Sequence, residues 1–127
     1  MNTEFIYPLR IHIEDTDCTG TVYHANYLNF FERARSEWMI KLGFNIEWQQ
    51  QHHIKFLVHS IDIKFLKPAT VHEHVEVVSI IKEKRKASII FDQCLRSTSD
   101  PAKLFCKAEI TVACVDDNMR PCAIPNG

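Results

Sequence analysis

Residues 26–42 read Asn26-Tyr27-Leu28-Asn29-Phe30-Phe31-Glu32-Arg33-Ala34-Arg35-Ser36-Glu37-Trp38-Met39-Ile40-Lys41-Leu42, and their pattern decides the fold. Apolar side chains recur three or four residues apart, which predicts an amphipathic helix that Gly43 ends. At about 1.5 Å per residue this helix is roughly 25 Å long and can cross several strands. Its other face is predicted to carry Glu32, Arg33, Arg35, Ser36, Glu37 and Lys41, with ion pairs such as Arg33 with Glu37.

Alternating apolar and polar residues predict strands on both sides of this helix. One strand is expected over residues 7–14, before the helix. After a polar, glutamine-rich segment, residues 56–65 alternate again and end before Pro68, with one face formed by Leu57, His59, Ile61, Ile63 and Phe65. Further strands are predicted over 75–81, 88–95 and 104–115. The run 110–115 is apolar on nearly both faces and should be a central strand.

The order of strand, long helix and four strands predicts an α+β domain with an antiparallel five-stranded sheet over residues 1–127. A single helix cannot cover both faces of such a sheet, and its edge strands need protection. We therefore expect at least a homodimer.

The composition favours a small-molecule substrate. The chain has 127 residues, 46% of them hydrophobic, and a formal net charge of -1, so the overall charge gives no indication of nucleic acid binding. The start of the chain lacks the pattern of a secretory signal, and no apolar run is long enough for a membrane span. Five widely spaced cysteines suit reduced thiols, so a cytoplasmic protein is expected.

The segment before the helix has the composition of an active-site loop, because it places Asp17, Gly20 and His24 next to a helix N-terminus. Free backbone N–H groups and the helix dipole there can stabilise negative charge on a reacting carbonyl oxygen. Asp17 alone is equally consistent with a turn residue, and His24 alone with a solvent-exposed one.

Several motifs together resemble the hotdog-fold acyl-CoA thioesterases of the 4-hydroxybenzoyl-CoA type, especially the bacterial branch associated with the Tol-Pal system. The resemblance covers nearly the whole chain and is carried by Glu14-Asp15-Thr16-Asp17, Gly20, Val22-Tyr23-His24-Ala25, Tyr27, Phe31-Glu32-Arg33-Ala34-Arg35, Phe65-Leu66-Lys67-Pro68-Ala69 and Arg120-Pro121-Cys122-Ala123-Ile124-Pro125. It implies a sheet wrapped around one long central helix, and dimers with two active sites at the subunit interface. Two positions differ from many relatives: Ile13 stands where some members of the branch carry an active-site tyrosine, and His72 stands where relatives often have an aspartate.

The resemblance implies that Asp17 acts as nucleophile on the thioester carbonyl or as base for a water. His24 begins the helix whose N–H group polarises that carbonyl, and its imidazole is a candidate to orient the thioester or to protonate the leaving thiolate. The candidate substrate-binding residues are Gly20, Val22 and Tyr23, although Tyr23 is as consistent with a buried aromatic anchor.

The other candidates are weaker. Asp15 is expected to order the turn, and Cys18 has no histidine partner fixed by sequence. Histidines 52, 53, 72 and 74 lack a third metal ligand at a recognisable spacing, so no metal is expected. The basic cluster Lys82, Lys84, Arg85 and Lys86 suits a solvated hairpin tip, with the phosphates of coenzyme A as the functional alternative.

The sequence therefore predicts an acyl-CoA thioesterase that releases a carboxylic acid and coenzyme A. Coenzyme A is part of the substrate and product, and no separate cofactor is expected. Acyl carrier protein is a possible second acyl donor, and a homodimer or homotetramer is expected. The alternatives are a hotdog hydratase or dehydratase that acts on acyl thioesters, and a non-catalytic acyl-CoA-binding protein.

Overall fold

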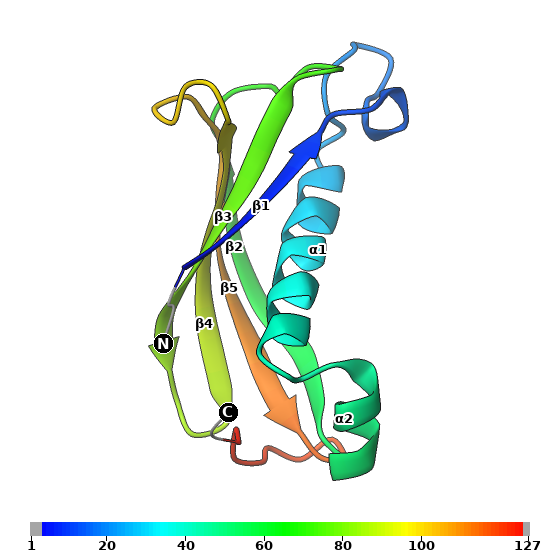
Figure 1. Ribbon diagram of the computed structural model, residues 1–127, viewed down its shortest axis with the longest axis vertical. Helices are drawn as coiled ribbons and strands as arrows, with labels where there is room; N and C mark the ends of the chain where they lie inside the picture. The colour runs from blue at the N-terminus through cyan, green and yellow to red at the C-terminus, as the bar shows by residue number, and fades with distance from the viewer. Residues whose placement is uncertain (1–3, 126–127) are drawn as a thin grey trace.

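The computed structural model describes residues 4–125, which form one five-stranded sheet with helices on one side (Figure 1). The elements in chain order are β1 (Glu4–Arg10), the short 3₁₀ helix η1 (Ile13–Asp15), α1 (Asn26–Lys41), α2 (Ile46–His52), β2 (Lys55–Phe65), β3 (His74–Lys84), β4 (Ser88–Ser97) and β5 (Leu104–Val115).

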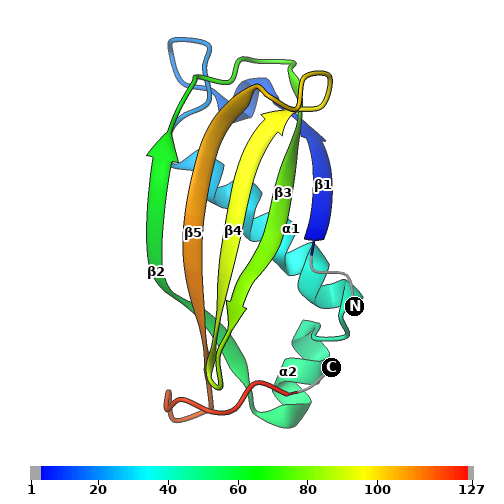
Figure 2. The same cartoon turned by 90° about the vertical axis from the view of Figure 1, so that its left-hand side faces the viewer.

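All strand pairs are antiparallel, and the order across the sheet is β1-β3-β4-β5-β2. The prediction that 110–115 belongs to an interior strand is confirmed, because β5 lies between β4 and β2. Strands β1 and β2 are the two edges. Since β2 and β3 are not neighbours, residues 66–73 carry the chain across one end of the sheet (Figure 2). Residues 66–73, the crossing segment, also contact the candidate site.

Helix α1 lies across one face of the sheet, and its apolar stripe forms much of the core (Figure 2). The predicted stripe is confirmed, because its buried members are Tyr27, Phe30, Phe31, Ala34 and Trp38. The predicted stop is confirmed as well: Gly43 has a φ of +94°, a conformation that side chains rarely adopt. No helix within residues 4–125 has the length and apolar character needed to cross a membrane.

Arg35 was predicted on the exposed face of α1, and this was wrong. The residue is 6% exposed, and its Nη1 donates to Gln93 Oε1 at 2.8 Å. Its Nη2 pairs with Glu32 at 2.8 Å. Gln93 in turn donates to Phe31 O and Ser79 Oγ. Burial lowers the pKa of Arg35, against the opposing charge of Glu32. These buried partners hold α1 on β3 and β4, and the predicted ion pair of Arg33 with Glu37 does not form among the described residues.

The strand predicted over 7–14 starts earlier and ends at Arg10, because the chain then turns into η1. The Asp15 carboxylate accepts the His12 N–H at 2.8 Å, and the Asp15 N–H donates back to the His12 carbonyl at 3.0 Å. This local pairing overrides the apolar alternation and leaves Ile13 72% exposed.

The glutamine-rich segment contains helix α2, which the sequence analysis did not predict. Asn45 caps it by accepting the Trp48 N–H at 2.9 Å. In β2, the pairing register shifts between Val58 and Ser60, so His59 is an extra residue in the strand. Because of this bulge, Val58 and Ile61 lie on the same face of the sheet, each beside its partner on β5, Val112 and Ile110. Placing Leu57 and His59 on the face of Ile61 was therefore wrong.

Candidate active site

The segment between η1 and α1 forms a tight turn around Asp17. Thr16 and Val22 form an antiparallel bridge, and the Asp17 N–H donates to the Thr21 carbonyl at 3.0 Å. The Gly20 N–H donates to the Asp17 carbonyl at 3.1 Å. Gly20 has a φ of +80°, so a side chain at this position would be strained. The backbone thus fixes where Asp17 projects.

The two backbone polar groups of Ala69, on the crossing segment, connect this turn to α1. The Val22 N–H donates to the Ala69 carbonyl at 2.9 Å, and the Ala69 N–H donates to the Tyr27 hydroxyl at 3.2 Å. Ala69 and Tyr27 are both buried. Burial also raises the pKa of Tyr27, which keeps the hydroxyl neutral and able to accept this bond. The first turn of α1 is therefore held in register with the Asp17 turn.

The Asp17 carboxylate is exposed and is held by Thr19. Its Oδ1 accepts the Thr19 hydroxyl at 2.5 Å and the Thr19 N–H at 2.8 Å. These two bonds, the hydroxyl first, lower the pKa of Asp17, and the charge of His24 adds a smaller effect in the same direction. Within residues 4–125 no other side chain is hydrogen-bonded to this carboxylate. Asp17 is therefore ionised at neutral pH and open to a ligand on its remaining side.

The start of α1 offers free backbone donors beside this turn. Ala25, at the N-cap, makes no side-chain cap. The Asn26 N–H donates to the Tyr23 carbonyl at 2.8 Å, but within the described chain the N–H groups of His24 and Ala25 have no acceptor. The Asp15 carbonyl fixes this terminus, because it accepts from the Tyr23 N–H and the Asn26 side chain. Such unpaired amides can bind an anionic oxygen.

The side chains around His24 form an exposed aromatic surface. The His24 ring packs against Tyr23, with 4.4 Å between ring centroids, and lies edge-on to Phe65 at 6.3 Å. Tyr23 is 45% exposed and Phe65 is 52% exposed. Tyr23 is therefore not a buried anchor, whereas Val22 packs in the core. Phe65 was not singled out as a site residue, although it opens the Phe65–Ala69 motif.

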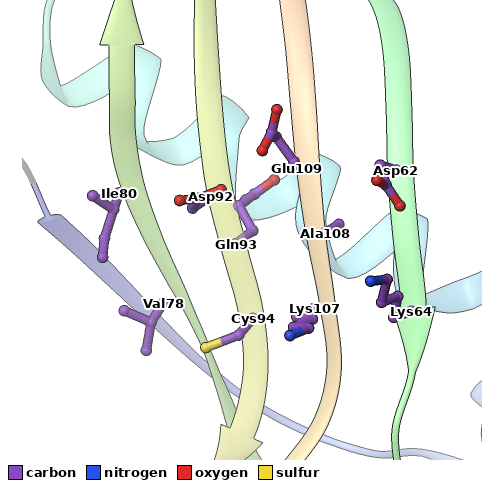
Figure 3. A pocket seen from close by; sticks show the side chains of 10 residues that line it. All are labelled: Asp62, Lys64, Val78, Ile80, Asp92, Gln93, Cys94, Lys107, Ala108 and Glu109. Atoms are coloured by element: carbon purple, nitrogen blue, oxygen red, sulfur yellow. The ribbon is translucent and has the colours of Figure 1, made fainter.

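Two cavities in the described chain lie away from Asp17. One, of about 370 Å³, is on the outer face of the sheet, where Figure 3 shows the side chains of Asp62, Lys64, Lys107 and Glu109 on β2 and β5. The other, of about 600 Å³, lies between the C-terminal half of α1, α2 and β2, and we call it the helix groove. Its apolar lining includes Met39, Ile40, Phe44, Phe56 and Val58. Neither cavity is lined by Asp17 or His24.

The weaker candidates lie apart from this turn or lack the contacts that they would need. Cys18 is exposed, and no histidine is bonded to it within residues 4–125. His52 bonds the Trp48 carbonyl and His53 pairs with Asp117 at the end of α2, whereas His72 and His74 lie where the crossing segment enters β3. Helix α2 and the start of β3 are at opposite ends of the molecule (Figure 1). In the basic cluster, Lys82 pairs with Glu109 and Arg85 with Glu83. This hairpin between β3 and β4 is also at the end of the sheet opposite the segment that leads into α1 in the same chain (Figure 1).

Comparison with known proteins gives consistent matches. The model of the thioesterase superfamily matches residues 19–103, a range that begins just after Asp17. The chain is 35% identical to the acyl-CoA thioesterase YbgC of Haemophilus influenzae over 98% of its length and 91% of the relative. It is 39% identical to the protein of the same name from Helicobacter pylori, over 76% of this chain and 73% of the relative.

Solved structures show the same fold. A probable thioesterase from Bartonella henselae superposes with a TM-score of 0.87 at 27% identity, over 96% of this chain and 99% of the other. A 1,4-dihydroxy-2-naphthoyl-CoA thioesterase from Synechocystis superposes with a TM-score of 0.88, over 96% of this chain and 90% of the other. At 18% identity, the second likeness speaks for the fold alone.

Replacing Thr19 by valine tests how the turn controls the charge of Asp17. The change removes the hydroxyl bond that stabilises the carboxylate, so the pKa of Asp17 should rise toward its ordinary value. We expect NMR titration of the side-chain carboxyl to show this upward shift. Thr16→Val is the matched control, because the Thr16 hydroxyl bonds the Ile13 carbonyl instead. An unchanged pKa in Thr19→Val would contradict the assignment.

Proposed function

The chain belongs to the thioesterase superfamily, and we propose that the turn before α1 is its active site, with Asp17 as nucleophile or general base. The reaction is hydrolysis of the thioester bond of acyl-CoA to a free carboxylic acid and coenzyme A. Relatives that align with nearly the whole chain are named for this activity. The observation that carries the proposal for the site is an ionised, exposed carboxylate on the turn that leads into a helix start with two unpaired amides.

Asp17 supplies the attack in this proposal. As a nucleophile its carboxylate adds to the thioester carbon, and as a base it takes a proton from a water that adds instead. A thiolate leaves more readily than an alkoxide or an amine, so a carboxylate suffices without a serine triad. The Thr19 bonds leave one side of the carboxylate open for either role.

The amides of His24 and Ala25 stabilise the oxyanion that forms on the thioester carbonyl oxygen. Removing one such donor in other enzymes costs roughly 2.7 to 4 kcal/mol, so the position of this helix terminus matters as much as any side chain. The His24 imidazole is exposed above Tyr23 and can orient the thioester or protonate the leaving thiolate. Tyr23 and Phe65 offer apolar surface to the acyl group, and Gly20 lets the backbone approach it.

We propose that a homodimer completes the site. Strand β2 is an unpaired edge in one chain, and its face toward the core exposes Val58, Ile61 and Phe65. Antiparallel pairing of two β2 edges about a twofold axis would reverse the direction of the partner's α1. The partner's Asp17 turn would then lie at the level of this chain's helix groove, which would receive the acyl chain. In this assembly α1 becomes a central helix.

Acyl-CoA is the donor in this proposal, with coenzyme A as part of substrate and product. Acyl carrier protein is a second candidate donor, because its phosphopantetheine carries the same thioester. The carboxylate and the free amides supply a base and an oxyanion site, so the reaction uses groups of the chain itself.

Release of free thiol from acyl-CoA substrates of different chain length tests the assigned roles. Asp17→Asn should lower kcat/KM by roughly 10² to 10⁴-fold, the range for loss of a general base, and His24→Ala should have a smaller effect because its backbone amide remains. Asp92→Asn, on β4 away from the turn, is the matched control and should leave activity unchanged.

Full activity in Asp17→Asn would refute its role. A product with altered unsaturation and an intact thioester would instead indicate a hydratase or dehydratase. Binding without turnover, equal in wild type and Asp17→Asn, would indicate a non-catalytic acyl-CoA-binding protein.

Light scattering after size exclusion tests the dimer. Ile61→Asp places a charge on the exposed apolar edge of β2, so this variant should run as a monomer and lose thiol release together with dimerisation. Met119→Asp, in an exposed loop, is the control and should remain a dimer. A fully active Ile61→Asp monomer would show that one chain suffices.

A further inference from the structure

The segment after β5 folds back along this strand. Val115 and Pro121 form an antiparallel bridge, and the Asp116 N–H donates to the Arg120 carbonyl at 2.9 Å. The Cys122 N–H donates to the Cys114 carbonyl at 3.0 Å. Cys114 and Cys122 are therefore directly opposite each other on two paired, antiparallel segments.

The two thiols are in contact. Their Sγ atoms are 3.4 Å apart, with Cys114 buried and Cys122 half-buried. Residues that face each other across two antiparallel segments have Cα atoms about 4.5 to 5.5 Å apart, within the roughly 4.4 to 6.8 Å that a disulfide spans. Closing the sulfur separation to about 2.05 Å therefore needs side-chain rotation and little backbone movement. No other two cysteine sulfurs among residues 4–125 are within hydrogen-bonding distance.

We propose that Cys114 and Cys122 form a reversible disulfide when the protein meets a peroxide. The half-buried Cys122 thiol loses its proton and the thiolate attacks the peroxide. The O–O bond breaks and the departing hydroxide takes up that proton, so a sulfenic acid and one water form. The Cys114 sulfur then attacks the Cys122 sulfur. The S–S bond forms, the S–O bond breaks, and a second water leaves with the thiol proton. In total, two thiols and one hydrogen peroxide give one disulfide and two waters, and a dithiol reductant reverses the change.

The environment of Cys114 sets the order of these steps. Burial first, and then contact with Cys122, raises the pKa of Cys114 to about 12, so this thiol is neutral at rest. Cys122 is more accessible and reacts first. Once the Cys122 sulfur has become a sulfenic acid, it no longer carries a thiolate charge that opposes loss of the proton from Cys114. Because attack needs a thiolate, disulfide formation should be faster at higher pH.

The disulfide would lock a segment that already joins several elements. The Ile124 N–H donates to the Lys86 carbonyl in the β3–β4 turn at 2.8 Å, and Ile124 packs against the core. Asp117 pairs with His53 at the end of α2 at 2.6 Å. The segment thus passes the ends of β4 and β5 beside α2 (Figures 1 and 2). A covalent link at this point restricts the unfolded chain and raises the thermal stability of the oxidised protein.

The test uses the full chain carrying Cys18→Ser, which removes the exposed thiol that could link two molecules. After treatment with hydrogen peroxide, we expect the intact mass to fall by two hydrogen atoms. Digestion before aspartate should yield the peptide 100–115 linked to one that contains Cys122, because Asp116 and Asp117 lie between the two cysteines. Since the first peptide holds Cys106 as well as Cys114, its fragmentation in the mass spectrometer should place the link at Cys114. The Tm should rise on oxidation and return with dithiothreitol.

Cys122→Ser in the same background is the matched control, and its folding is checked by its Tm under reducing conditions. It should show neither the mass loss nor the rise in Tm. The proposal is overturned if Cys122 is oxidised to sulfinic acid while Cys114 stays a free thiol. It is also overturned if Cys122 pairs with a cysteine other than Cys114, or if both thiols survive peroxide that oxidises Cys18 in the parent chain.

Discussion

The backbone of one buried residue, Ala69, holds the candidate site together. Its carbonyl accepts from Val22 in the Asp17 turn, and its N–H donates to the Tyr27 hydroxyl in the first turn of α1. The carboxylate of Asp17 and the amides that begin α1 belong to different segments. The proposed attack on a thioester therefore needs a fixed distance between them. The crossing segment provides that link, and the buried contacts of Arg35 with Gln93 hold the rest of α1 on the sheet.

A single chain leaves two surfaces that its own elements do not cover. On the core side, the apolar edge of β2 adjoins the helix groove, while the Asp17 turn lies on the surface at the other end of α1. On the outer side, the opposed pair Asp62 and Glu109 lies two residues along the strands from the opposed pair Lys64 and Lys107 (Figure 3). Within one chain the helix groove and the Asp17 turn are far apart, and the proposed dimer brings the groove of one chain to the turn of the other. This is the physical reason why dimerisation and catalysis are expected to be coupled.

Local periodicity predicted the parts of the fold that depend on nearby residues. The buried stripe of α1, strands β3 to β5, and the positive φ of Gly20 and Gly43 all follow from spacing or residue type. The burial of Arg35 does not follow from local spacing, because its partner Gln93 is 58 positions away in the chain. The end of β1 and helix α2 depend on local polar contacts that compete with the pattern, and the bulge at His59 is a feature of the pairing between β2 and β5. In the site, motif resemblance indicated Asp17 and His24, but the Ala69 link and the position of Phe65 needed the tertiary structure.

Asp17 and the amides of His24 and Ala25 are proposed to act on the same bound thioester. A crystal structure of Asp17→Asn bound to acyl-CoA tests this most directly. We expect the thioester oxygen within roughly 3 Å of at least one of these amides, with the residue 17 side chain about 3 Å from the carbonyl carbon or joined to it by one water. A thioester bound elsewhere, beyond the reach of one water from residue 17, would contradict it.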